Sequence, residues 1–228
     1  MRAANQMQDP SVPEELPAYA VSRAAQIVRL SPSTLRLWAG GNGDHKQLFV
    51  PADEQPLNLS FSNLVEAFVL ASIRRVHGIS MQKVRKALHL VGTEMGIKRP
   101  LIHAQFKTDG KRLFIERAGR LLEASQPNQA LLEKILSQNL ERIDWGLDVA
   151  QRLHPWVRAD IGAAQPKSIV IDPRRGFGQP VIIGTGIQAR VVAGRYRAGE
   201  SINELADDYG LSLDLIEDAI RCETVEAA

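Results

Sequence analysis

Several residue types and patterns are scarce in this chain of 228 residues, and each absence excludes a class of protein. Cys222 is the only cysteine, which excludes an intrachain disulfide and a zinc site built from cysteines. No apolar run approaches the roughly 18 to 20 residues of a membrane-spanning helix, and the start of the chain lacks the hydrophobic core of a signal peptide. We therefore expect a cytoplasmic protein with no membrane partner.

Sequence patterns that carry catalysis are also missing. The histidines stand apart without an HExxH spacing, and the chain has no P-loop, no GxSxG and no Cys-His arrangement. The acidic groups Asp207-Asp208 and Asp214-Glu217-Asp218 lack the glycine-supported geometry of a magnesium site. We therefore expect no enzyme activity, no metal and no cofactor.

Charge is divided unequally along the chain. Residues 1–120 hold 17 Lys and Arg against 10 Asp and Glu, a net of +7, whereas residues 121–228 hold 11 against 16, a net of −5. A basic surface favours contacts with phosphates, because neutralising them releases counterions. An acidic surface is repelled from DNA, and therefore suits a protein partner or self-association.

The stretch Tyr19–Trp38, YAVSRAAQIVRLSPSTLRLW, predicts two short helices joined by a tight turn. Ser31-Pro32 supplies an N-cap and the proline that is favoured at the first position of the second helix. A second helix with polar residues outward and Leu35 packed on the first helix is typical of a recognition helix. The candidate contacts to base edges or phosphates are Arg23, Ser33, Thr34 and Arg36, with Tyr19 and Lys46 as phosphate contacts. Helix pairs of this kind also occur in proteins that bind no nucleic acid.

This pattern resembles the N-terminal domain of MerR-type proteins, and the likeness resumes over residues 73–85, IRRVHGISMQKVR. The matching positions in the first part are Tyr19, Ala25, Leu30, Ser31-Pro32, Thr34-Leu35-Arg36 and Trp38. The resemblance implies a helix-turn-helix that reads operator DNA as part of a dimer. Two positions depart from the family, because Arg23 stands where glutamate is usual and Ala39 where glutamate often follows the aromatic residue. Base preferences therefore cannot be transferred.

The segment after this helix pair predicts a hairpin or wing over residues 39–56. Three glycines with Asn42 and Asp44 lie between short apolar pieces, and such residues tolerate the backbone angles of tight turns. His45 and Lys46 are then expected near the tip, either within reach of a phosphate or simply in solvent.

Two helices are expected next. The first, Asn63–His77, has a broad apolar face that indicates deep packing, and Gly78 ends it. Ser80 caps the second, whose core positions are Met81, Val84, Leu88 and Val91. Basic residues gather around the turn and either extend the DNA-facing surface or form a solvated helix face. They are Arg74, Arg75, Lys83, Arg85 and Lys86.

The middle of the chain predicts a small antiparallel sheet. Asp109-Gly110 separates two β-prone runs within residues 101–125, and Ala118-Gly119 precedes a third, so we expect a meander. A helix that starts at Pro127 and carries an apolar stripe from Leu131 to Ile143 is expected to cover it. The residues expected in the core or at an interface are Trp145, His154-Pro155 and Trp156.

Residues 168–222 predict a compact C-terminal module. A short strand at Val181–Ile183 precedes three helices, at about 188–197, 202–209 and 213–222. Ser201 with Glu204 forms a capping box, Gly210 closes the second helix and Ser212 caps the third. The result is a second unit like a helix-turn-helix.

This module resembles a small domain of unknown function with a GxPxIxGTxI motif, which occurs in many bacterial VapB-like antitoxins encoded beside PIN-type toxins. The matching positions are Asp172-Pro173, Gly178, Pro180, Gly184-Thr185 and Ile187. Gln179 and Gly186 depart from the basic residue and the arginine that the family commonly has there. The resemblance implies an antitoxin with a PIN-type ribonuclease as its partner.

A second motif overlaps the same residues. The run Gly184-Thr185-Gly186-Ile187-Gln188-Ala189 is a literal GxGxxA, the spacing of Rossmann dinucleotide sites. No second parallel strand is predicted within the roughly thirty residues that such a unit requires. The glycines are therefore interpreted as a tight turn from strand to helix.

The end of the chain is strongly acidic. Residues 201–228 hold eight Asp and Glu against Arg221 alone, so we expect a surface for dimerisation or for the toxin, or else a plain solvated surface. The candidate residues are Glu204, Asp207, Asp208, Asp214, Glu217 and Asp218.

The expected fold class is mainly α with a small antiparallel β meander, an α+β chain. The expected divisions are a flexible N-terminus over 1–18, a MerR-like winged helix-turn-helix over 19–95, a linking region over 96–165 and a helical antitoxin-type domain over 166–228. The expected function is a type II antitoxin that neutralises a PIN-type, VapC-like ribonuclease and represses its own operator, double-stranded DNA, as a homodimer or higher oligomer. The alternatives are an effector-sensing MerR-type regulator whose middle sheet binds a small molecule, and a pure protein-interaction module.

Overall fold

The computed structural model describes residues 12–42, 46–76, 79–122, 126–158 and 165–224. Its α-helices are α1 (Val21–Val28), α2 (Pro32–Gly40), α3 (Phe61–Arg74), α4 (Met81–Met95), α5 (Asp109–Leu122), α6 (Gln126–Leu140), α7 (Ala189–Arg197), α8 (Ile202–Tyr209) and α9 (Leu213–Thr224). Its strands are β1 (Tyr19–Ala20), β2 (Asp53–Glu54), β3 (Leu57–Leu59), β4 (Ile143–Trp145), β5 (Ala150–Leu153), β6 (Ile169–Val170) and β7 (Val181–Ile182). Short 3-10 helices are η1 (Pro13–Glu15), η2 (Pro100–Ile102), η3 (Ala104–Lys107) and η4 (Gly176–Gly178). The mainly helical fold with small antiparallel sheets agrees with the predicted α+β class.

The two helices predicted from residues 19–38 are present as α1 and α2. Arg29 ends α1 in the left-handed conformation, with φ of 58°, and the chain then turns into α2 within three residues. The side-chain oxygen of Ser31 accepts a hydrogen bond from the backbone N–H of Thr34 at 3.3 Å, so the predicted N-cap is confirmed. Leu35 and Trp38 are buried, as their spacing predicts.

The predicted hairpin lies further along the chain than expected. Strands β2 and β3 pair around Gln55-Pro56, and β3 also pairs with β1, which gives an antiparallel sheet of order β1-β3-β2. The register places Tyr19 opposite Leu59, so both side chains are buried, and this pairing fixes where the hairpin forms. Lys46 therefore lies beside the end of α2 rather than at a hairpin tip, and His45 lies outside the described residues.

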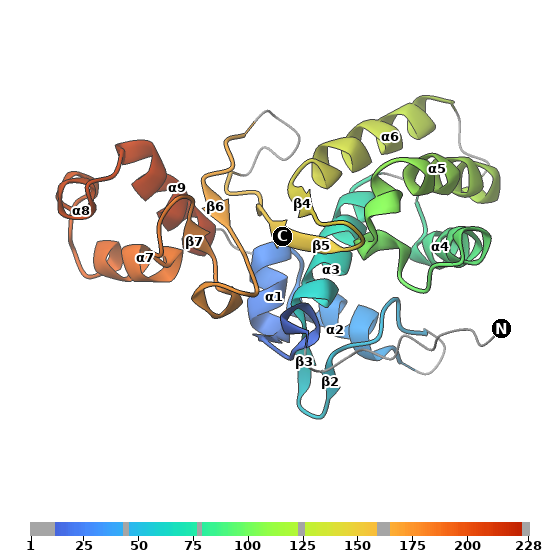
Figure 1. Ribbon diagram of the computed structural model, residues 1–228, viewed down its shortest axis with the longest axis horizontal. Coiled ribbons are helices and arrows are strands. Elements are labelled where there is room, and N and C mark those ends of the chain that lie inside the picture. The colour runs from blue at the N-terminus through green and yellow to red at the C-terminus, as the bar shows by residue number, and fades with distance from the viewer. Residues whose placement is uncertain (1–11, 43–45, 77–78, 123–125, 159–164, 225–228) are drawn as a thin grey trace.

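Helix α3 runs through the centre of the molecule (Figure 1), between the α1–α2 pair and α6. Every residue from Phe61 to Ile73 is buried, which explains a sequence that is apolar almost all round. The one carboxylate among them, Glu66, accepts hydrogen bonds from Arg99 at 2.7 and 3.1 Å. The expected helix over 63–77 is thus present, and Gly78, its predicted end, lies outside the described residues.

The β meander predicted over residues 101–125 is wrong, because the described part of this segment is helical. It forms η2, η3 and α5. Phe114 and Ala118 are both buried, and their spacing of four is a helical period that short apolar runs concealed. Gly110 does not make a turn: a Cβ atom there would meet Phe106 at 3.0 Å and the sulfur of Met95 at 3.1 Å, so the glycine lets η3 and α4 pack closely on α5.

The small sheet of this region forms later in the chain. Strands β4 and β5 pair antiparallel, after the helix α6 that the sequence predicts. His154 and Trp156 are buried in this part, as expected, and Trp145 packs against the same core.

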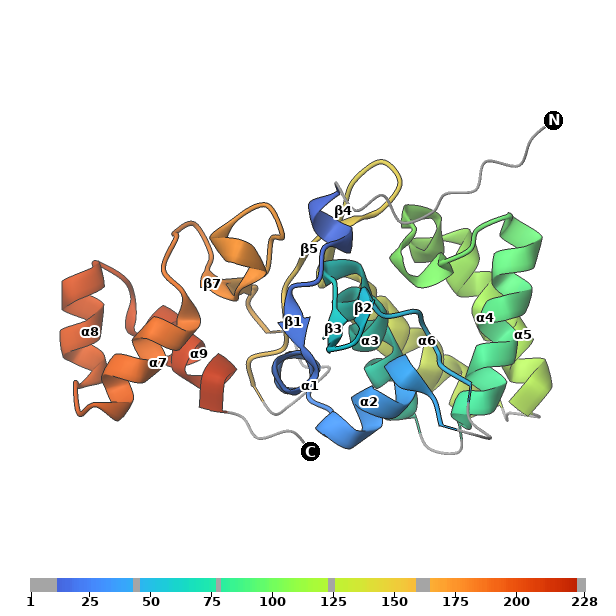
Figure 2. The same cartoon turned by 90° about the horizontal axis from the view of Figure 1, so that it is seen from below.

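Buried apolar side chains form two cores. The first extends from Tyr19 to Trp156 and includes Ile171, so the helix pair and the middle region pack as one unit. The second extends from Val157 to Ile220 and joins β6, β7 and α7 to α9. Figures 1 and 2 show this C-terminal unit at one end of an elongated molecule, with α4, α5 and α6 at the other. Within the described ranges, no helix is both long and apolar enough to cross a membrane.

The three predicted C-terminal helices are confirmed as α7, α8 and α9. Both halves of the Ser201 and Glu204 capping box are formed, and Gly210 ends α8 with φ of 63°. The GxGxxA run is a hydrogen-bonded turn, because the Thr185 hydroxyl donates to the Ile182 carbonyl at 2.9 Å and accepts from the Ile187 N–H at 3.0 Å. Since β6 and β7 are antiparallel, this is no Rossmann unit.

Candidate nucleic-acid interface

Helix α2 presents polar side chains away from the core. Ser33 and Arg36 are exposed, whereas Leu35 between them is fully buried. Thr34 is half-buried, and its hydroxyl oxygen accepts a hydrogen bond from Ser31 at 2.9 Å, so this side chain takes part in the helix cap. The outward face of α2 therefore offers a hydroxyl and a guanidinium with helical spacing, groups that read base edges and phosphates.

Basic side chains from other elements adjoin α2. The Arg74 guanidinium of α3 lies over the Trp38 ring, 6.0 Å from its centroid. Exposed Lys46 follows α2, and its backbone carbonyl accepts a hydrogen bond from Arg85 of α4. Exposed Lys83 lies on the same first turns of α4. Two residues of the predicted basic cluster thus contact α2 or the segment after it, Arg74 by packing on Trp38 and Arg85 by a hydrogen bond to Lys46.

Tyr19 is placed differently from the phosphate contact expected of it. Its side chain is only 1% exposed, and its hydroxyl donates to the carbonyl of Gly178 at 2.7 Å. Burial raises the pKa of this phenol well above its ordinary value, although the charge of Arg23 acts in the opposite direction. Because both the ring and the hydroxyl are used internally, Tyr19 cannot reach a phosphate in this conformation.

Arg23 also has an internal partner. Its two terminal nitrogens donate to the two carboxylate oxygens of Glu223 in α9, both at 2.7 Å. Gln26, one turn later in α1, donates to the backbone carbonyl of Glu223 at 3.0 Å. Burial disfavours the charge of Arg23, but the hydrogen bonds and the charge of Glu223 outweigh it and raise the Arg23 pKa. The expected DNA contact is therefore a link between α1 and α9 in this structure.

Further polar contacts join the C-terminal unit to the first core. Arg174 pairs with buried Glu14 at 2.7 Å, and Arg152 of β5 pairs with Asp172 at 3.0 Å. Leu153 and Ile171 exchange backbone hydrogen bonds at 3.0 and 2.8 Å. The C-terminal unit is thus docked along one side of η1, β1 and α1, and leaves the outward face of α2 open.

Asp218 differs from the surface residue that the acidic pattern indicates. It is fully buried, and its carboxylate accepts from Ser168 at 2.6 Å, Arg221 at 3.1 Å and Arg158 at 3.4 Å. The bonds from Ser168 and Arg158 connect α9 to the chain that precedes β6, whereas the bond from Arg221 lies within α9. A carboxylate so enclosed stabilises the module and cannot meet a partner protein.

The remaining acidic candidates lie on the surface or at its edge. Asp207 and Asp214 are exposed. Asp208 pairs with Arg195 at 2.5 Å, and Glu217 pairs with Arg221 at 2.6 Å. Glu204 accepts from the backbone and side chain of Ser201, which lower its pKa. Ion pairs and helix capping within the module thus occupy several of the carboxylates that were expected to bind a partner protein.

An open pocket of about 480 Å³ lies where α1 meets the C-terminal unit. Its lining consists of Arg23, Phe177, Gln179, Gln188, Arg190 and Glu223. Phe177 is 92% exposed and has a positive φ of 55°, a conformation that is strained for a bulky residue. Sequence reasoning missed this residue, although its place between Gly176 and Gly178 was a signal of an aromatic side chain held out on a tight loop.

Known proteins resemble this chain along most of its length. A family described as "Protein of unknown function (DUF433)" matches residues 169–221. A protein of Mycobacterium tuberculosis (strain ATCC 25618 / H37Rv), named "Putative antitoxin VapB45", is 30% identical over an alignment of 232 positions, and the alignment covers 90% of this chain and 93% of that protein. The chain belongs to the VapB45 family.

Two further comparisons agree with the assignment of this chain to the VapB45 family. "Uncharacterized protein Rv2308" of the same strain is 23% identical over 211 residues, 89% of this chain and 88% of that protein. The X-ray crystal structure of Rv2018 from Mycobacterium tuberculosis superposes with a TM-score of 0.68 at 26% identity, and covers 90% of this chain and 98% of that one. Both likenesses therefore extend through the two cores.

The DUF433 match divides the pocket of this VapB45-family chain. Phe177, Gln179, Gln188 and Arg190 lie within the matched residues, whereas Arg23 comes from α1 and Glu223 from the end of α9. The pocket is thus completed only when the C-terminal unit is docked on the helix pair. Among the described residues, no group of three or more His, Cys, Asp and Glu has an arrangement that could hold a metal ion.

Proposed function

We propose that this chain is the antitoxin of a type II toxin-antitoxin pair and that it represses its own operon by binding operator DNA. The antitoxin role is supported by the likeness to VapB45, which covers 90% of the chain. The DNA-binding role is carried by one observation: α2 follows a tight turn after α1, is capped by Ser31 and exposes Ser33 and Arg36, and the segment that follows it is bonded to α4 through Lys46 and Arg85.

In this proposal α1, α2 and the β2–β3 hairpin form a winged helix-turn-helix of the MerR type. Helix α2 enters the major groove, with Arg36 and Ser33 toward base edges and Thr34 close to them. Lys46 contacts a phosphate, because it is exposed beside the end of α2. Tyr19 and Arg23 support the helix pair from within and do not touch DNA. Two copies reading half-sites about one helical turn apart would form the homodimer.

The toxin in this proposal is a PIN-type ribonuclease, and the C-terminal unit carries its binding surface. The exposed carboxylates Asp207 and Asp214 are the acidic groups that remain for a partner, because Asp218 is buried. This surface lies on α8 and the start of α9, at the far end of the molecule from α2 (Figure 2). Toxin and operator could therefore be bound at the same time.

The DNA-binding role is tested by fluorescence anisotropy with a duplex taken from the DNA upstream of the chain's own reading frame. Arg36→Ala is expected to weaken binding by about 1 to 3 kcal/mol if Arg36 meets a base edge. Arg112→Ala is the matched control, since Arg112 is an exposed arginine on α5, remote from α2. Unchanged affinity of Arg36→Ala at the same salt concentration would exclude Arg36 from the interface.

The antitoxin role is tested by bacterial growth on induction of the neighbouring reading frame, alone and together with this chain. Growth arrest by the neighbour alone, with rescue on co-expression, supports the proposal. A harmless neighbour refutes it. The alternative of an effector-sensing regulator has lost its structural basis, because the segment that was to form its ligand-binding sheet is helical.

A further inference from the structure

Exposed charges of the C-terminal unit are divided between its elements, which its net acidity conceals. Exposed carboxylates without an α7 partner lie at Asp207 on α8 and Asp214 at the start of α9, whereas Asp208 pairs with Arg195 of α7. Exposed arginines lie around Phe177 and along α7, and we call this the basic face. They are Arg174, Arg175, Arg190 and Arg197. The one carboxylate in the Phe177 pocket, Glu223, is neutralised by its two hydrogen bonds to Arg23.

Helix α7 turns an unusual stripe outward on this basic face. Arg190, Gly194 and Arg197 follow one another at spacings of four and three, so they share one side of the helix. A Cβ atom at Gly194 would meet nothing within 4 Å, and the residue has an ordinary helical conformation, so packing inside the protein does not require a glycine there. A glycine between two exposed arginines instead gives room for another molecule's backbone to approach the helix.

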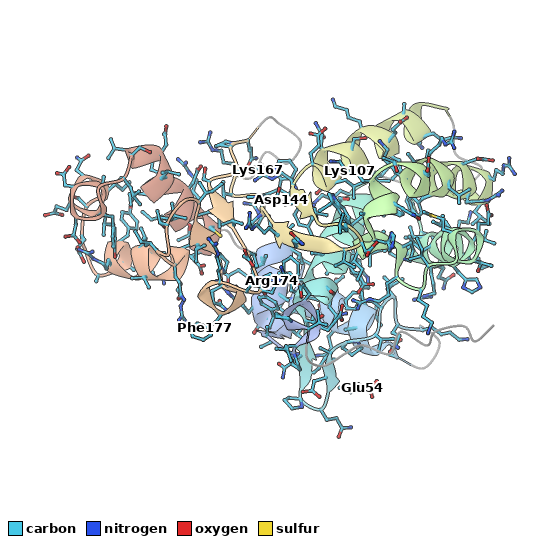
Figure 3. The ribbon with its side chains drawn as sticks, viewed as in Figure 1. Glu54, Lys107, Asp144, Lys167, Arg174 and Phe177 are labelled. Carbon is cyan, nitrogen blue, oxygen red and sulfur yellow. The ribbon has the colours of Figure 1, made fainter. Side chains whose placement is uncertain are left out.

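The spacing of the two arginines suits a nucleic-acid strand. Seven residues of helix separate Arg190 from Arg197 by about 10.5 Å at about 1.5 Å per residue. Measured along the duplex axis, this corresponds to roughly three phosphate steps of one strand, at about 3.4 Å each. Phe177 projects from the neighbouring loop on the same lower side of the molecule as the hairpin residue Glu54 (Figure 3). An exposed aromatic side chain flanked by arginines is the arrangement with which proteins insert an apolar wedge beside the bases of a duplex.

We propose that the Phe177 loop and the Arg190–Arg197 face of α7 bind duplex DNA as a second contact, beside the site read by α2. The inference rests on the proposed operator binding and extends it to the DNA that flanks that site. Arg190 and Arg197 bind phosphates of one strand, Gly194 allows the strand to lie close to α7, and Phe177 enters the adjacent groove. The docking of α9 on α1 sets the distance between the two contacts, because Arg23 of α1 and Glu223 of α9 line the same pocket as Phe177 and Arg190.

The test is anisotropy titration of the full chain, over a series of KCl concentrations, with a duplex of about 40 base pairs, roughly four helical turns, from upstream of its reading frame. The double variant Arg190→Gln with Arg197→Gln should reduce the slope of log K against log salt by about 1.8, since each lost phosphate contact removes about 0.9. Arg112→Gln on α5 should leave the slope unchanged.

Two further variants separate DNA contact from structure. Phe177→Ala should weaken binding roughly tenfold at fixed salt while leaving the slope unchanged, because it removes an uncharged contact. Leu147→Ala is its control, since Leu147 is 98% exposed in the β4–β5 turn. Gly194→Gln should raise Tm by about 2 °C, because glutamine is the better helix former, and yet weaken DNA binding. A structural role for these residues would move Tm and affinity in the same direction.

The outcomes distinguish this inference from the proposed function. If Arg36→Ala weakens binding while the Phe177 and arginine variants bind as the wild type does, the second contact is refuted and operator binding by α2 stands. If these variants keep DNA binding but no longer co-purify with the co-expressed neighbour protein, the face belongs to a protein partner and the inference is likewise refuted. If the wild-type chain shows no salt-dependent binding to the duplex, both proposals fail.

Discussion

Replacing Arg23 by alanine should weaken the docking of α9 on α1. The two hydrogen bonds that Arg23 donates to Glu223 join residues 200 positions apart in the sequence, and both are 2.7 Å long. The Arg23 side chain is 21% exposed and that of Glu223 only 7%. Exposed pairs contribute less than about 1 kcal/mol, whereas loss of one partner of a buried pair costs about 3 to 5 kcal/mol. For this intermediate burial we expect Arg23→Ala to reduce the free energy of docking by about 2 kcal/mol.

The only cysteine gives a direct assay of this docking. Cys222 lies next to Glu223, and burial together with the charge of Glu223 raises the pKa of its thiol to about 12, against the opposing effect of Arg23 and Arg29. Cys222 is half-buried, and a thiol with such a pKa reacts slowly with a disulfide reagent. We therefore expect modification to be faster in the undocked state, where the thiol is more accessible. A loss of about 2 kcal/mol should accelerate modification at fixed pH roughly 30-fold. Removal of Arg23 by itself would raise the thiol pKa and slow the reaction, so acceleration cannot be a direct charge effect.

Two controls locate the change. Tryptophan fluorescence of Arg23→Ala should equal that of the wild type under the conditions of the thiol assay, because Trp38, Trp145 and Trp156 all belong to or pack against the first core. Glu223→Ala should cost less than Arg23→Ala, since a stranded Arg23 keeps its hydrogen bond to Gln26 at 2.9 Å and reaches solvent. An acceleration of less than about threefold in Arg23→Ala, below roughly 0.7 kcal/mol, would refute the view that this pair holds α9 on α1.

Three further outcomes follow from single contacts. Gly178→Ala should lower the free energy of unfolding in urea by about 1 to 3 kcal/mol, because φ is +68° there and the new Cβ would lie 2.7 Å from the hydroxyl oxygen of Tyr19. Arg142→Leu should cost about 3 kcal/mol or more in the same measurement, because this buried guanidinium donates to four backbone carbonyls that would lose their partner. Asp144 has a lowered pKa: burial alone would raise it, but the hydrogen bond and charge of His154, with Lys167, lower it. The ionised Asp144 carboxylate therefore stabilises the folded state above about pH 4, and this stabilisation is lost as pH falls through the lowered pKa. The melting temperatures of the wild type and of Asp144→Asn should then converge in acid.

Local sequence signals predicted much of the secondary structure. The Ser31-Pro32 start of α2, the Ser201 and Glu204 capping box and Gly210 at the end of α8 each act within one helical turn. These capping interactions join residues that are neighbours in the sequence, so the sequence alone predicts where the helices begin and end. The segment over residues 101–125 was mispredicted because short apolar runs fit a strand as well as a helix. Tertiary packing decides between the two, here with the rings of Phe106 and Phe114 in contact at a centroid distance of 6.1 Å.

The predicted site residues also differ in how far near neighbours in the sequence decide their exposure. Ser33 and Arg36 are exposed as the helical period of α2 predicts, since the buried positions of a short helix also fix its outward face. The helical period does not indicate which outward side chains will be buried by a distant part of the chain. Tyr19 and Asp218 were expected at surfaces, and both are buried, by partners 159 and 50 residues away in the sequence.

The sequence by itself therefore determined most of the helices other than α5, several of their caps and the faces that α2 and α4 turn outward, because these depend on interactions between near neighbours. Only the tertiary structure decided that α9 lies against α1, that Arg23 binds Glu223 and that Phe177 stands exposed beside the pocket between them. Those contacts depend on how two separately buried cores meet, and the desolvation and pairing of each side chain are set by that geometry rather than by its neighbours in the chain.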